Sequence, residues 1–100
     1  MKKIIGKVTT YNGTEHGHLK NYKVRIVAVM RNSLKPGIED DDPEQDYIRD
    51  DDYLQQTGGV TIFDRIDVQP WLEKEGRFSF VTSDARAQDL ACFEHLAKSQ

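Results

Sequence analysis

Cysteine and long apolar runs are scarce in this chain, and each scarcity excludes a class of protein. The single cysteine, Cys92, has no second thiol to pair with, so the fold does not depend on an internal disulfide bond. The longest apolar run, Ile26–Met30, is far shorter than a membrane-spanning segment. The basic N-terminus also lacks the apolar stretch of a secretion signal. We therefore expect a cytoplasmic protein that does not enter membranes.

The composition is that of one small globular domain. A chain of 100 residues can bury one modest core, so residues 1–100 are expected to form a single domain. Hydrophobic residues make up 37% of the chain and charged residues 31%, which places it toward the polar side of the globular range.

Charge is distributed very unevenly along the chain. The net charge is only −3, but residues 1–38 hold eight bases and one acid, whereas residues 39–52 hold nine acids and one base. Residues 53–100 hold five bases and seven acids. The sequence is therefore a basic third, an acidic segment (residues 39–52) and a mixed remainder.

Hydrophobic periodicity predicts four strands and one helix. Residues 22–31 alternate apolar and basic side chains and then become uniformly apolar, as a central strand would. Asn12-Gly13 is a strong hairpin-turn dipeptide, because both residues tolerate a positive φ. Ser83 or Asp84 can cap a helix with an apolar stripe at helical spacing. The expected elements are strands at about 3–11, 22–31, 62–69 and 77–82, an acidic crossover at 38–57, and a helix at about 84–98.

These elements predict a mostly-β or α+β fold with a small curled antiparallel sheet of four to five strands. The C-terminal helix would cover one end or face of that sheet. A strand, a glycine-containing turn and then a strongly apolar second strand resemble the start of an SH3-like or OB-like small barrel. The resemblance concerns the strand pattern alone and implies only that class of fold.

The acidic segment raises the first functional hypothesis. Its carboxylates could serve as a solvated surface, could lie back across the basic strand residues, or could face a basic protein partner. We expect a non-catalytic binding or accessory module that docks a protein with a basic surface. The residues expected to bind that partner are Asp40, Asp41, Asp42, Asp50, Asp51, Asp52 and Trp71.

The basic N-terminal third supports an alternative function. Lysines and arginines can contact phosphates, and tyrosine rings can stack on bases, so this region could bind single-stranded nucleic acid. The same alternating bases also serve solubility on an exposed strand. The residues expected to carry this alternative are Tyr22, Lys23, Arg25 and Arg31.

A metal-binding protein or a small metal-dependent enzyme, with its metal bound through His16 and His18, is the second alternative. His16 and His18 would point to one side of a strand and could bind a transition metal, provided that a third ligand came from elsewhere in the chain. Histidines beside glycine are more often turn residues, so this pair is a weaker candidate.

Catalysis has little support in the sequence. It contains neither a phosphate-binding glycine loop followed by lysine nor a Cys-x-x-Cys motif. Ser83 and Asp84 are triad residue types, but either is explained as a helix cap. We therefore expect neither an enzyme nor a cofactor, and the sequence leaves open whether the chain forms a homodimer.

Overall fold

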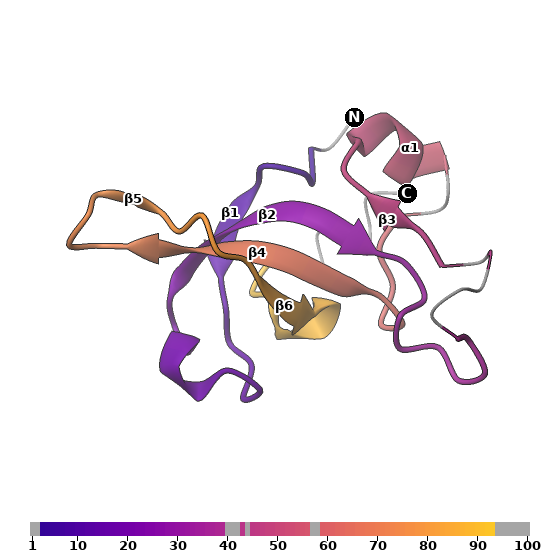
Figure 1. Ribbon diagram of the computed structural model, residues 1–100, viewed down its shortest axis with the longest axis horizontal. Helices are drawn as coiled ribbons and strands as arrows, with labels where there is room; N and C mark the ends of the chain where they lie inside the picture. Colours follow the sequence, from indigo (N-terminus) through magenta and orange to yellow (C-terminus); the bar gives the residue numbers. More distant parts are fainter. Residues whose placement is uncertain (1–2, 40–42, 44, 57–58, 94–100) are drawn as a thin grey trace.

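A computed structural model describes residues 3–39, 43, 45–56 and 59–93 of the chain. The fold is mostly β, as the sequence predicts, with six antiparallel strands in one sheet and little helix (Figure 1). The strands are β1 (Val8–Thr10), β2 (Lys23–Met30), β3 (Tyr47–Ile48), β4 (Arg65–Leu72), β5 (Arg77–Phe78) and β6 (Ser83–Arg86). The helical elements are α1 (Asp51–Gln56) and the 3₁₀ helices η1 (Gly17–Leu19) and η2 (Ala87–Asp89).

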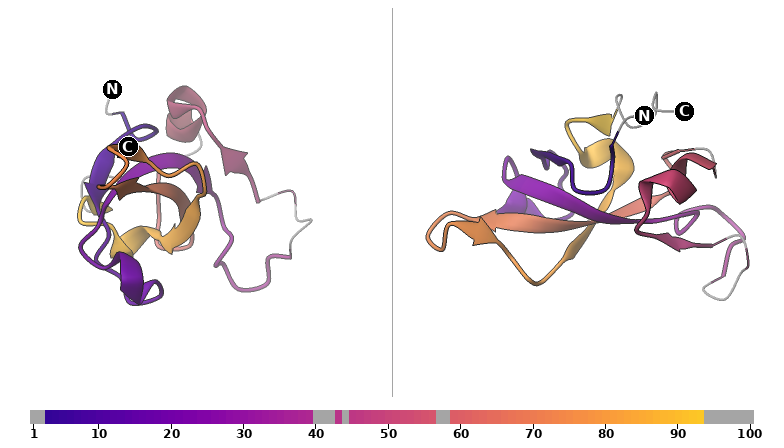
Figure 2. Two further views of the ribbon diagram at one scale, coloured as in Figure 1. Left: turned by 60° about the vertical axis from the view of Figure 1, so that its left-hand side comes forward. Right: turned by 90° about the horizontal axis from the view of Figure 1, so that it is seen from above.

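The two long strands, β2 and β4, form the centre of the sheet. They pair with each other, and each carries two short strands along its other edge: β1 and β3 beside β2, and β5 and β6 beside β4. We call the β2–β4 pair the central ribbon. A different short strand lies beside each of its four corners (Figures 1 and 2).

Side-chain alternation explains why these two strands are central. Every second residue of β4 is buried from Ile66 to Pro70, and β2 buries Val24 and Ile26 in the same way. The pairing register shifts between Ile26 and Ala28, which is typical of a β-bulge with one extra residue. The shift allows Ala28 and Val29 to be buried although they are adjacent.

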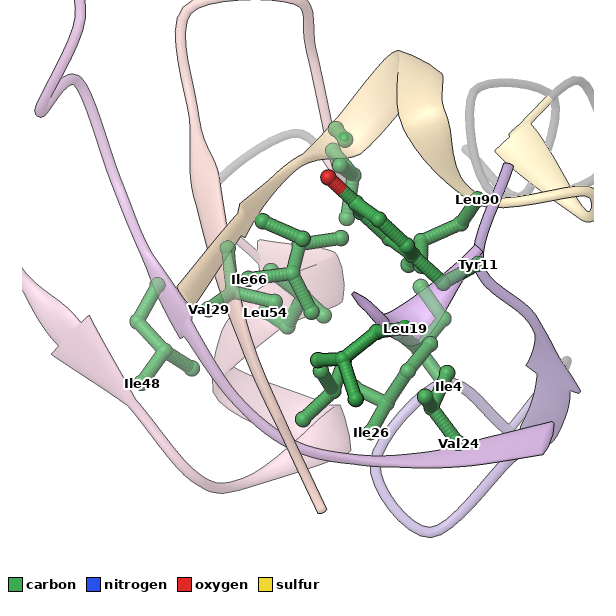
Figure 3. Close-up of a cluster of buried hydrophobic side chains, with 14 residues drawn as sticks. Ile4, Tyr11, Leu19, Val24, Ile26, Val29, Ile48, Leu54, Ile66 and Leu90 are labelled. Atoms are coloured by element: carbon green, nitrogen blue, oxygen red, sulfur yellow. The ribbon is translucent and has the colours of Figure 1, made fainter. Parts of the chain in front are cut away.

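One hydrophobic core lies on the inner face of the curled sheet. Strands β2 and β4 supply its centre, and residues from the N-terminal segment, α1 and the region after β6 cover it (Figure 3). The buried cluster contains Ile4, Tyr11, Leu19, Val24, Ile26, Val29, Ile48, Leu54, Val60, Ile66, Val68, Ala85, Ala87 and Leu90.

The expected barrel is not formed. The four outer strands are only two to four residues long, and each covers part of one edge of the central ribbon. One isolated bridge joins Tyr11 to Leu90 and is flanked by a hydrogen bond from Ala91 N–H to Thr10 C=O at 2.9 Å. This contact brings β1 near the chain after β6 without closing the ladder.

The expected C-terminal helix at 84–98 is also wrong for residues 84–92. Ser83–Arg86 is strand β6, which pairs with β4 over four residues and buries Ala85. A single 3₁₀ turn, η2, follows it. Pairing with a central strand thus overrides local helix propensity, which is a weak determinant by comparison. Residues 94–98 lie outside the described residues.

The other expected boundaries shift by a few residues. β4 begins at Arg65 rather than residue 62, and the strand expected at 77–82 is limited to β5. The expected acidic crossover at 38–57 contains strand β3 and helix α1. Within the described ranges, no helix is long and apolar enough to span a membrane.

Candidate functional site

The acidic segment is attached to the fold through two of its carboxylates. Asp50 caps α1, because its Oδ1 accepts hydrogen bonds from two backbone N–H groups in the first turn at 2.8 and 3.2 Å. Asp51 Oδ1 accepts hydrogen bonds from the backbone N–H groups of Ile4 at 2.8 Å and Ile5 at 2.9 Å. Two of the aspartates expected to dock a partner therefore have structural roles.

Two tyrosines also form hydrogen bonds in this region. The Tyr47 hydroxyl donates to Asp67 Oδ2 at 2.6 Å, and the Tyr53 hydroxyl donates to Asp46 Oδ2 at 3.1 Å. The hydrogen bond to the Asp46 carboxylate, together with its negative charge, raises the pKa of Tyr53 above the ordinary value. The guanidinium of Arg49 lies 4.8 Å from the centre of the Tyr47 ring.

The remaining residues of the expected docking surface are not brought together. Asp40, Asp41 and Asp42 lie outside the described residues, and Asp52 is exposed on α1. Trp71 pairs with β5, and β5 and α1 lie at opposite ends of the central ribbon (Figures 1 and 2). The acidic segment and Trp71 are therefore separate surfaces.

Trp71 instead lies beside the basic residues of β2. The register pairs Val24 with Pro70, so Lys23 follows opposite Trp71, and Trp71 is directly opposite Phe78 on β5. The Lys23 ammonium lies 4.3 Å from the Trp71 ring centre, and the Trp71 and Phe78 rings meet edge to face at 5.0 Å. A row across three strands thus contains one cation, Lys23, followed by two aromatic rings, Trp71 and Phe78.

Arg25 extends this row into a wider surface. Its guanidinium donates two hydrogen bonds to Gln69 Oε1, at 2.7 and 3.2 Å, and lies 4.6 Å from the centre of the Phe78 ring. Gln69 therefore fixes the orientation of Arg25 over the ring. We call this surface the cation–aromatic face, and its residues are Lys23, Arg25, Gln69, Trp71 and Phe78.

A groove borders the cation–aromatic face. It has a volume of about 660 Å³, within the range of ligand sites in proteins. One wall comes from the start of β2 and the residues before it, and the other from the end of β4 and the turn into β5. The lining residues of this Trp71 groove are Asn21, Tyr22, Lys23, Trp71, Leu72, Glu73, Lys74 and Glu75.

The structure thus combines residues from two separate sequence hypotheses. Tyr22, Lys23 and Arg25, expected for nucleic acid, lie with Trp71, which was expected for a protein partner. Arg31 does not join them, because it follows β2 at its other end and its Nη2 donates to Gly59 C=O at 2.9 Å.

The histidine pair lies in the loop before β2. His16 Nε2 donates a hydrogen bond to the backbone carbonyl of Asp84 at 2.6 Å, and the His16 and His18 rings meet edge to face at 6.2 Å. In the part of the chain that the structure describes, no three His, Cys, Asp or Glu side chains are grouped closely enough to hold a metal ion. His16 thus has a structural contact, which links the loop to β6.

Sequence reasoning missed Gln69 and Phe78 on the cation–aromatic face. It also missed several residues that line the Trp71 groove: Asn21, Leu72, Glu73, Lys74 and Glu75. Phe78 and Phe80 both fall in the strand expected at 77–82, whereas β5 ends at Phe78 and Phe80 is 82% exposed beyond it. The four-residue turn between β4 and β5 was the sequence signal that could have placed Phe78. In a hairpin with this turn Leu72 pairs with Arg77, and the next pair is Trp71 with Phe78.

Comparison of the chain with protein-family models, curated proteins and solved structures gives no match in any of the three. The functional argument therefore depends on the chemistry of the site itself.

Proposed function

We propose that this protein is a non-catalytic module that binds single-stranded nucleic acid through the cation–aromatic face. The observation that carries the proposal is the row of Lys23, Trp71 and Phe78 across three strands, with Arg25 beside it. Aromatic rings on a sheet are stacking platforms for unpaired bases, and neighbouring cations bind the phosphates that connect those bases.

The rigidity of the face supports binding of an ordered ligand. Trp71 is paired with Phe78 on β5 and directly follows Pro70, which is paired with Val24 on β2, and Arg25 is held by Gln69. A binding group that is already fixed loses little conformational entropy when the ligand arrives. Among the residues that the structure describes, no carboxylate forms an ion pair with the Lys23 ammonium above the Trp71 ring, so a base can take its place and the ammonium can move to a phosphate.

The position of the acidic segment also supports the proposal. A carboxylate-rich surface next to the site would repel phosphate, but the described part of this segment lies at the other end of the central ribbon (Figure 1). Exposed charges farther apart than about 10 Å are largely screened at ordinary ionic strength. The net charge of −3 therefore does not describe the charge that a ligand meets at the Trp71 groove.

The decisive experiment uses the single tryptophan of the chain as a reporter. A short oligo(dT) is titrated into the protein at low salt while tryptophan fluorescence is recorded. A base that stacks on Trp71 changes its emission in a saturable way. Labelled oligonucleotide anisotropy then gives the affinity of the variants. Phe78→Ala should weaken binding by about 5-fold to 150-fold, since one base stack is worth about 1–3 kcal/mol.

Lys35→Ala is the matched control, because Lys35 is a cation beyond the far end of β2. The affinity of Lys35→Ala for oligo(dT) should stay within about twofold of the wild-type affinity if only the cations at the cation–aromatic face contribute to binding. Absence of any fluorescence or anisotropy change at low salt would overturn the proposal.

Docking of a basic protein by the acidic segment is the second candidate. It is favoured by the exposure of Asp52 together with the half-exposed rings of Tyr47 and Tyr53 near it in the chain. Its test is capture of one defined, strongly basic probe protein. A variant with Asn at Asp40, Asp41, Asp42, Asp50, Asp51 and Asp52 should lose that capture, whereas Phe78→Ala should not.

A further inference from the structure

The Trp71 groove contains two carboxylates, which is unexpected for a surface that binds phosphates. Glu75 is neutralised by Arg77, whose Nη2 lies 2.9 Å from its Oε1. Glu73 forms no ion pair with any residue that the structure describes and is exposed at the groove. A carboxylate in this position repels the ligand backbone, so it favours binding only where the ligand offers it a hydrogen-bond donor.

Hydrogen-bonding chemistry limits what that partner can be. An ionised carboxylate only accepts hydrogen bonds, and its two oxygens fit two parallel donors best. Unpaired bases present their Watson–Crick edges to a protein. Guanine offers two adjacent donors there, N1–H and N2–H₂, whereas thymine and uracil offer a single N3–H, and adenine and cytosine offer a single amino group beside an acceptor.

We infer that the Trp71 groove prefers guanine and that Glu73 is the residue that determines this preference. The inference rests on the proposed function. Glu73 follows Trp71 by two residues and lines the same groove, so a guanine stacked on Trp71 can turn its Watson–Crick edge toward the Glu73 carboxylate. Lys23 and Lys74, on the two walls of the groove, are then available to the flanking phosphates.

The test compares three oligo(dT) strands that differ at one central position: thymine, guanine or hypoxanthine. A single guanine avoids four-stranded structures. The wild-type protein should bind the guanine strand at least about fivefold more tightly than oligo(dT), since a bidentate contact to a base discriminates by about this factor or more. Hypoxanthine lacks the 2-amino group and should lose most of that advantage.

Glu73→Gln should remove the guanine preference, because its amide presents one acceptor and one donor group in place of two acceptors. Its affinity for oligo(dT) should stay the same or increase, since a negative charge is lost. Glu39→Gln removes a carboxylate from the exposed acidic segment and should keep the preference.

Equal binding of all three strands, or an unchanged preference in Glu73→Gln, would overturn the inference while leaving the proposed function in place. Failure of every strand to bind would overturn both. A guanine preference that disappears with hypoxanthine and with Glu73→Gln would support the inference.

Discussion

Asp64 is a fully buried carboxylate that accepts hydrogen bonds from two backbone N–H groups, one nearby in the chain and one at the end of β2. Its Oδ1 accepts a hydrogen bond from Asn32 N–H at 2.8 Å, and its Oδ2 accepts one from Thr61 N–H at 2.9 Å. Asn32 has a φ of 60°, so the turn after β2 adopts a conformation that non-glycine residues rarely take. The single side chain thus holds together the end of β2 and the start of β4.

Asp64→Ala should lower the free energy of unfolding by about 3 kcal/mol, because two partly buried N–H groups would lose a charged acceptor. Urea denaturation would measure the change. Asp52→Ala, which removes an exposed carboxylate from the first turn of α1, should cost less than about 1 kcal/mol. Similar losses in the two variants would contradict the structural role of Asp64.

Tyr53 provides a prediction about pH. Its raised pKa means that the folded protein holds the phenolic proton more firmly than the unfolded chain does. The stabilising contribution is therefore complete below the ordinary tyrosine pKa of about 10 and is lost as the pH rises through the higher pKa of the folded protein.

The wild-type absorbance titration minus that of Tyr53→Phe isolates this group. We expect its midpoint to lie above the ordinary value and to move down in Asp46→Asn, which removes the charge but keeps an acceptor. A midpoint that is unchanged by Asp46→Asn would show that the Asp46 carboxylate is not the cause.

At the scale of elements, the loop between β1 and β2 is fixed by a close approach at Gly13. A Cβ at Gly13 would lie 2.5 Å from both Asp89 Oδ2 and the Tyr11 hydroxyl oxygen. The same region contains the hydrogen bond from Asn12 N–H to Asp89 C=O at 2.7 Å. Glycine thus allows the chain after β1 to pack directly on η2.

Gly13→Ala should therefore destabilise the fold by about 1–3 kcal/mol, the usual cost of forcing an added methyl group into a packed site. Gly17→Ala is a matched control, because nothing lies within 4 Å of a Cβ at that position. It should change stability by less than about 0.5 kcal/mol. Thermal or urea unfolding compares the two, and equal effects would contradict the close approach.

At the scale of the whole molecule, the two charged surfaces are separated along the long axis. The structure extends about 40 Å in its longest dimension, with β5 at one end and α1 at the other (Figure 1). Three cations lie at the cation–aromatic face and Trp71 groove, namely Lys23, Arg25 and Lys74. Added salt should therefore weaken ligand binding by screening the contacts of these three cations with phosphates.

If each cation contacts one phosphate, the logarithm of the association constant should fall with the logarithm of salt concentration with a slope of about −2. Lys74→Ala should reduce the slope to about −1.4, because one contact fewer releases fewer counterions. Anisotropy titrations over a series of salt concentrations would measure both slopes. A slope near zero would show that phosphates are not bound.

Alternation within strands made part of this fold predictable. Val24 and Ile26 were recognised as the buried side of β2, and the antiparallel, mostly-β class followed from such patterns. Residues 84–93 were not predictable in this way, because their apolar spacing also suits a helix. The stabilisation from pairing β6 with β4 depends on a distant strand and cannot be inferred from the local sequence.

The sequence alone determined the mostly-β class of fold, the central position of β2 and the uneven distribution of charge, because these depend on residue type and near-neighbour spacing. Only the tertiary structure decided which residues share a surface. It separated Trp71 from the acidic segment and placed it beside Lys23, because the register between β2, β4 and β5 is set by long-range backbone pairing. The candidate site is a product of that register.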